Sequence, residues 1–169
     1  MTLDLFVTVT MNGLTLAALY FIVASGFSLI FGLMRTVNMA HGSLYLVGAY
    51  IGYAVFDPLH NADSTYAISW WVGILGGVLA AALVGVLMQV TLLGWMQGQE
   101  LRQALITIGL SIIIADQILA HFGGNSRQFF PPDALFGSSP FPIIDKYPTF
   151  RLVQIVIAVL VGVGLWLLL

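Results

Sequence analysis

The chain has 169 residues, of which 60% are hydrophobic and only 7% are charged, and its formal net charge is −2. Soluble globular domains are about one quarter charged, so these charges are too few to cover a water-exposed surface, and we expect a lipid bilayer around the protein. The sequence has no cysteine, basic patch, HExxH motif, P-loop or GxGxxG motif, which excludes disulfides and thiol catalysis and predicts no nucleic acid partner, cofactor, metal or catalytic residue.

Charged residues separate apolar stretches that are long enough to cross a membrane as helices. A span needs about 20 apolar residues, and the sequence predicts about five spans. They cover 6–34, 42–56, 70–97, 104–121 and 152–169. These stretches are apolar at odd and even positions alike, unlike the alternating strands of a β-barrel. We therefore expect an all-α integral membrane protein with a single transmembrane domain over 1–169.

The first two spans differ from the others in ways that affect the topology. The first charge in the chain is Asp4, no positively charged region precedes it, and the apolar run that follows is much longer than that of a signal peptide. We therefore interpret the first span as a retained helix. The second span is short, so it is tilted, half-buried, or continuous with a broken stretch that begins near Asn38. Asp57 begins a short polar loop after it.

Small residues spaced four apart predict faces on which helices pack closely. These positions are Ser28 and Gly32, Gly48 and Gly52, and Gly77, Ala81 and Gly85. Bundle packing explains them better than a pore-lining role.

The segment 122–151 differs from the apolar stretches in composition. It contains five of the six prolines and many of the aromatic residues. Proline breaks helices and aromatic residues favour the headgroup layer, so we expect this segment to lie along the outer, periplasmic interface. It is either an ordinary structured loop or a docking surface for an external partner. Arg35 and Arg102 fall in short loops of the opposite side, which predicts a cytoplasmic location for that side and an N-terminus outside.

Several motifs occur in one order along the chain. They are Asn12-Gly13-Leu14, the Gly26–Gly32 stretch, Asn38-Met39-Ala40-His41-Gly42, Gly48-Ala49-Tyr50, the Thr107–Ile114 stretch and the Ser126–Gly137 segment. In this order they resemble the N-terminal region of branched-chain amino acid ABC transporter permeases. Urea and short-chain amide permeases share the pattern, so the resemblance leaves the substrate open among these classes.

The resemblance implies a non-enzymatic transport subunit of the bacterial inner membrane. Its partners would be a second permease subunit, cytoplasmic ABC ATPases that drive alternating access, and a periplasmic substrate-binding protein. Family members continue beyond the position of Leu169 into a basic loop that meets the ATPase. We therefore expect this chain to correspond to the N-terminal part of a permease.

Five polar or glycine positions are candidates for the substrate pathway: Asn12, Asn38, His41, Gly42 and Asp116. Asn38, His41 and Gly42 interrupt an apolar region, where irregular backbone must be buried in protein or line a watery cavity. The side-chain oxygen of Asn38 has the chemistry to cap a helix. Alternatively, 35–41 is an interfacial turn. Asp116 is a carboxylate within a span, which marks either a functional group or a structural position near the outer end.

Two other function classes remain open. A passive channel or accessory scaffold of five helices would need no coupling to ATP, and substrate flux without ATP would reveal it. An intramembrane enzyme is the weakest interpretation, because the histidines lack metal-ligand spacing and no GxSG nucleophile motif is present.

Overall fold

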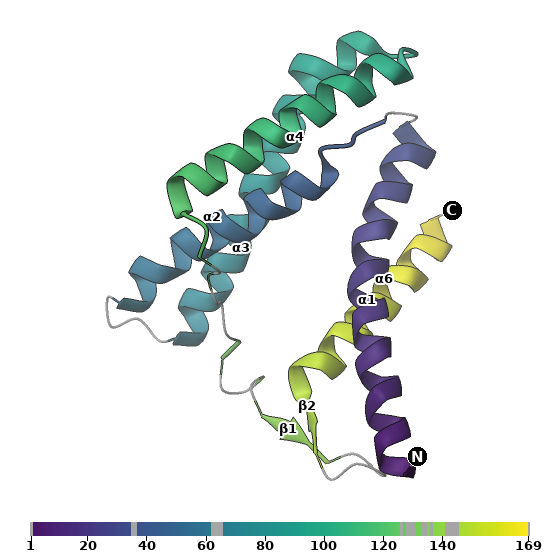
Figure 1. Cartoon of the computed structure of the whole chain (residues 1–169), viewed down its shortest axis with the longest axis vertical. Coiled ribbons are helices and arrows are strands. Elements are labelled where there is room, and N and C mark those ends of the chain that lie inside the picture. Colours follow the sequence, from purple (N-terminus) through teal and green to yellow (C-terminus); the bar gives the residue numbers. More distant parts are fainter. Residues whose placement is uncertain are drawn as a thin grey trace. The chain divides into compact units, whose positions relative to one another are not determined.

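The computed structural model describes residues 2–34, 37–61, 66–125, 127, 131–132, 135, 137–140 and 146–168 (Figure 1). Its elements in chain order are α1 (Leu3–Met34), α2 (His41–Asn61), α3 (Tyr66–Met88), the π-helix η1 (Gln89–Leu93), the 3-10 helix η2 (Gly94–Met96), α4 (Glu100–Phe122), the strands β1 (Ser138–Ser139) and β2 (Tyr147–Pro148), and α6 (Thr149–Leu168). The predicted all-α class is confirmed.

Within the described residues, four helical stretches are long and apolar enough to cross a membrane. They are Leu3–Leu33, Ala67–Met96, Glu100–Phe122 and Thr149–Leu167. They coincide with four of the five predicted spans. The fifth prediction, 42–56, corresponds to α2, a helix of 21 residues that includes Pro58.

The prediction that a polar loop begins at Asp57 is wrong for residues 57–61, because α2 continues to Asn61. Two side-chain pairs four residues apart support its last turns. The Tyr53 hydroxyl donates to Oδ1 of Asp57 at 3.1 Å, and the rings of Phe56 and His60 stack with their centroids 5.3 Å apart. The helix therefore continues past Pro58, although proline cannot donate a backbone hydrogen bond.

The chain divides into two compact units, which consist of residues 1–28 with 130–169, and of residues 29–129. In the first unit, α6 crosses α1 (Figure 1). A side chain on Gly162 would start 3.3 Å from the Phe21 ring. The strand pair β1–β2 aligns Ser139 with Tyr147, and this fixes Tyr147 two residues before α6. Tyr147 is only 2% exposed.

In the second unit, α2 and α3 pack as an antiparallel pair through small residues. An added Cβ on Gly48 would lie 3.3 Å from the carbonyl oxygen of Gly77, and one on Gly52 would lie 2.9 Å from that of Gly73. The backbones therefore approach closely, as small residues four apart allow. This confirms the packing face predicted at Gly48 and Gly52 of α2, and the one predicted for α3 at its first residue, Gly77. By contrast, an added Cβ on Gly32 meets nothing within 4 Å.

The helical run of α3 continues through η1 and η2 before the chain reverses into α4. The indole nitrogen of Trp95 donates to the carbonyl oxygen of Val90 at 3.2 Å. Gly98 then adopts a φ of 79°, a left-handed conformation that favours glycine. This turn brings Met96 beside the first turns of α4, where the backbone amide of Gln99 donates to the Met96 carbonyl at 3.1 Å.

We predict that Gly77→Leu destabilises the second unit. A Cβ on Gly77 would lie 2.3 Å from the carbonyl oxygen of Gly48, so α2 and α3 must separate, and overpacking of this kind costs about 1–3 kcal/mol or more. Thermal unfolding of the detergent-purified protein, followed by size-exclusion chromatography, measures the effect. Gly109→Leu is the control, because an added Cβ there meets nothing within 4 Å. Equal melting temperatures for the two variants would contradict the prediction.

Candidate functional site

The segment Val37–Ala40, called here the 37–40 link, precedes α2 and is not helical. Its backbone amides are bound by side chains of α4. The amide of Val37 donates to Oε1 of Gln103 at 3.1 Å, and the amide of Met39 donates to Oγ1 of Thr107 at 3.0 Å. Residues four apart share one face of a helix, so one face of α4 holds the link.

Gln103 and Thr107 are both completely buried, and their remaining polar groups are also bonded. Nε2 of Gln103 donates to the carbonyl oxygen of Met96 at 2.9 Å, and the Thr107 hydroxyl donates to the carbonyl oxygen of Gln103 at 2.8 Å. One turn further along α4, the Ser43 hydroxyl donates to the carbonyl oxygen of Ser111 at 3.3 Å. The link is therefore irregular backbone whose Val37 and Met39 amides are bonded by buried side chains of α4, although Met39 itself is exposed.

Asn38 shapes the entry into α2 and is only 6% exposed. Its Oδ1 accepts from the amide of Ala40 at 3.0 Å, and its carbonyl oxygen accepts from the amide of His41 at 3.4 Å. The side chain therefore closes a turn over two residues, a common role of asparagine. The sequence suggested that this oxygen caps a helix, but the amide that it binds belongs to Ala40, which lies just before α2 and not in its first turn.

His41 and Gly42 begin α2 directly after this turn. His41 is half-buried, and its Nδ1 atom is shielded from solvent. Gly42 is exposed, and an added Cβ there meets nothing within 4 Å. No close contact within the described residues explains a glycine at this position. The structure thus brings Asn38, His41 and Gly42 together at one helix start, beside α4.

Asp116 lies elsewhere on α4. It is nine residues beyond Thr107. At 3.6 residues per turn this is about two and a half turns, so Asp116 lies on the face of α4 opposite to the one that holds the link. Its side chain is exposed. Among the described residues it has no hydrogen bond or ion pair.

Asn12 belongs to the first unit, where a polar cluster joins α1 to the start of α6. Oδ1 of Asn12 accepts from Nη1 of Arg151 and, at 3.3 Å, from the Tyr147 hydroxyl. That hydroxyl also lies 3.0 Å from Oγ1 of Thr15, and the Arg151 guanidinium carbon is 6.0 Å from the centre of the Tyr147 ring. We call Asn12, Thr15, Tyr147 and Arg151 the Asn12 cluster.

Sequence reasoning missed the residues that complete both arrangements. Gln103, Thr107 and Ser111 recur every four residues in an apolar helix, a signal that was available in the sequence. Tyr147 lies 132 residues after Thr15, and no local pattern predicts that contact. Within the part of the chain that the structure describes, no three His, Asp or Glu side chains form a group that could hold a metal ion.

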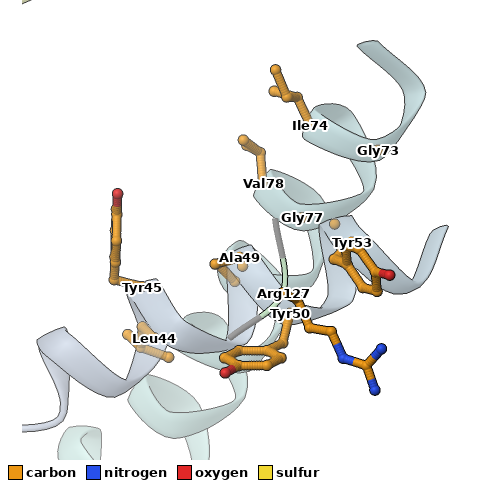
Figure 2. A pocket seen from close by; sticks show the side chains of 13 residues that line it. Leu44, Tyr45, Ala49, Tyr50, Tyr53, Gly73, Ile74, Gly77, Val78 and Arg127 are labelled. Carbon is orange, nitrogen blue, oxygen red and sulfur yellow. The ribbon is translucent and has the colours of Figure 1, made fainter. Parts of the chain in front are cut away.

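A cavity of about 500 Å³ lies against α2 and α3 in the second unit (Figure 2). Its lining includes Tyr45, Tyr50, Tyr53, Ile74, Val78 and Arg127. None of the five predicted site residues is among those that line it.

We predict that Thr107→Val loosens the 37–40 link. Valine matches threonine in shape but cannot accept a hydrogen bond from the Met39 amide. Leaving a buried hydrogen-bonding group without its partner costs about 1–3 kcal/mol of stability. Hydrogen–deuterium exchange of peptides that cover the link should become roughly tenfold faster or more. Thr91→Val is the matched control, because the exposed Thr91 hydroxyl bonds only the carbonyl of Leu87 in its own helical run, at 2.6 Å. Unchanged exchange in Thr107→Val would refute the docking role.

Comparison with known proteins identifies a matching family and several relatives. Residues 9–169 match the family model described as the permease component of branched-chain amino acid transport systems. The high-affinity branched-chain amino acid transport system permease protein LivH of Salmonella typhimurium is 28% identical over 76 residues, which are 44% of this chain and 24% of that protein. LivH of Escherichia coli strain K12 is 27% identical over 84 residues, 50% of this chain and 25% of LivH.

A longer match involves the corresponding permease protein BraD of Pseudomonas aeruginosa. It is 22% identical over 162 residues, which are 92% of this chain and 53% of BraD. The chain therefore spans at most about half the length of these curated relatives. No solved structure matches the chain significantly. Because the family model covers nearly the whole chain, from residue 9 to residue 169, this protein belongs to the family of branched-chain amino acid transport permease components.

Proposed function

We propose that this chain is part of the membrane-spanning permease subunit of an ABC importer in the bacterial inner membrane. Its substrates would be branched-chain or related small amino acids or amides, and partner ATPases would drive alternating access. A second permease subunit and a periplasmic substrate-binding protein would complete the assembly. The family match over residues 9–169 carries this proposal. The four membrane-length helices of the described residues support it.

Within that function, we propose that the start of α2 contributes to the substrate pathway. The 37–40 link fixes Asn38 and His41 against α4 through two bonded amides, at 3.1 and 3.0 Å. Gly42 is exposed beside them and carries no side chain to cover the backbone. A fixed polar backbone with an uncovered glycine suits the passage of a small polar molecule.

Asn12 and Asp116 have different roles in this proposal. Asn12 anchors Arg151 and Tyr147 at the start of α6, so it would act by positioning a cation in the first unit. Asp116 is an exposed carboxylate within a membrane-length helix. Such groups usually face a protein neighbour or a watery cavity, and we propose that Asp116 faces the pathway or the second permease subunit.

Uptake by the assembled importer tests the function. The permease, its ATPases and its binding protein are reconstituted in liposomes, and entry of labelled leucine, urea and acetamide is measured with and without ATP. We expect uptake of one of these substrates that requires both ATP and the binding protein. Equal flux without ATP would instead indicate a passive channel.

In the same assay, Asp116→Asn tests whether the charge of Asp116 is needed for uptake. Unchanged uptake at all pH values would exclude Asp116 as a charged group of the pathway.

We predict that Gly42→Leu lowers uptake at least severalfold while leaving the folded protein intact. An added Cβ meets nothing within 4 Å, and leucine favours helices over glycine by up to about 1 kcal/mol, so stability should not fall. Transport should fall because the new side chain projects from the exposed start of α2 into the proposed pathway.

Two measurements accompany this variant. Thermal unfolding of purified Gly42→Leu shows whether it folds normally, and Gly109→Leu is the matched substitution at another open helical glycine. Normal uptake by a stable Gly42→Leu protein would exclude the start of α2 from the pathway.

A further inference from the structure

The cavity between α2 and α3 is a long, mostly apolar groove, called here the α2–α3 groove. Gly48, Gly52 and Gly77 are among its lining residues and also make the close contact between the two helices. Their backbones line the groove, and the aliphatic groups of Ile74 and Val78 border it (Figure 2). Val78 is 60% exposed, so the groove opens on the outer surface of the helix pair.

One end of the α2–α3 groove carries an exposed cation. The guanidinium carbon of Arg127 lies 5.8 Å from the centre of the Tyr53 ring, and Nη2 donates to the carbonyl oxygen of Phe122 at 3.4 Å. Arginine has five N–H donors, and its side chain is exposed here. In the described residues Arg127 has no ion pair, so most of its donors are available to an anion. The Asp57 carboxylate accepts from the Tyr53 hydroxyl at 3.1 Å, one turn further along α2.

This charged end lies where α4 ends. The ring of Tyr50 contacts that of Phe122, the last residue of α4, with centroids 4.9 Å apart. Tyrosine is enriched at the boundary between hydrocarbon and headgroups. Because α4 is long and apolar enough to span a membrane, Tyr50, Tyr53 and Arg127 are expected at headgroup level.

The length of the groove matches half of a bilayer. Its lining runs along α2 from Leu44 to Tyr53, which is about 13.5 Å at 1.5 Å per residue. The hydrocarbon core of a bilayer is about 30 Å thick, so one leaflet contributes about 15 Å. The groove therefore runs from headgroup level to about the middle of the membrane.

We propose that the α2–α3 groove binds one anionic phospholipid, with an acyl chain along Gly48, Ile74 and Val78 and its phosphate on Arg127. Arginine binds phosphate through paired, charge-assisted hydrogen bonds, and basic pockets between membrane helices hold anionic headgroups. A free amino acid is much shorter than the groove and would leave its apolar part empty. The proposal concerns the membrane surroundings of the chain and does not depend on what the protein transports.

Native mass spectrometry of the full-length permease in detergent tests this proposal. The protein is titrated with phosphatidylglycerol or phosphatidylcholine of the same acyl chains, and bound lipids are counted. We expect one phosphatidylglycerol site that prefers this lipid over phosphatidylcholine. Arg127→Gln should weaken phosphatidylglycerol binding about fivefold, the effect of about 1 kcal/mol per basic residue, and Arg127→Lys should retain most of it. Arg102→Gln is the control, because Arg102 lies outside the groove and bonds Gln99.

A second pair of variants tests the acyl chain. Ala49 is exposed and lines the groove, so Ala49→Phe should fill it and weaken both lipids, whereas Ala82→Phe, at an exposed position of α3 outside the groove, should not. Equal binding of the two lipids to the wild type would overturn the proposal. Binding that depends on Arg127 but is unaffected by Ala49→Phe would also overturn it, because the site would then hold only an anion. Displacement of the lipid by leucine would also overturn the proposal, because the groove would then be a substrate site and not a lipid site.

Discussion

In the second unit, the start of α2 depends on side chains that satisfy the backbone amides of the 37–40 link. The 37–40 link is not helical, so its amides cannot bond within a helix, and leaving them unbonded in a membrane would cost several kcal/mol each. Gln103 and Thr107 meet this need from one face of α4. The same contacts fix where α2 begins and therefore the position of Asn38, His41 and Gly42. The candidate pathway residues are thus held by side chains that belong to another helix.

Close packing of α2 against α3 follows a second constraint, the absence of side chains at glycine positions. Between membrane helices, association relies on van der Waals contact and hydrogen bonds, since lipid is as apolar as the helices themselves. Gly48, Gly52 and Gly77 let the backbones approach within contact distance. The backbones of the same glycines line the α2–α3 groove. One feature of the sequence therefore stabilises the helix pair and leaves a surface shaped for an acyl chain.

The candidate site was predictable in part. Asn38, His41 and Gly42 stood out because polar residues and glycine interrupt an apolar region, and the structure places them together at a helix start. Asn12 was a candidate as part of the Asn12-Gly13-Leu14 motif, but the sequence did not predict which residues it contacts. Tyr147 and Arg151 lie more than 130 residues away in sequence, and neighbouring residues say nothing of such a contact. Asp116 shares α4 with Thr107 but faces the opposite direction, which follows from the helical repeat once the docked face is known.

The sequence by itself determined the class of the protein, its apolar helices and the small-residue faces of α2 and α3. Those properties depend on composition and on local spacing, because hydrocarbon selects long apolar helices and glycine pairs select close contact. The end of α2 was misjudged, because the polar residues and Pro58 after Phe56 do not end the helix, which continues to Asn61. Only the tertiary structure decided which side chains complete the 37–40 link and the Asn12 cluster, and where Arg127 lies. Hydrogen bonds between segments far apart in the chain depend on how the helices meet, and local sequence patterns do not record that arrangement.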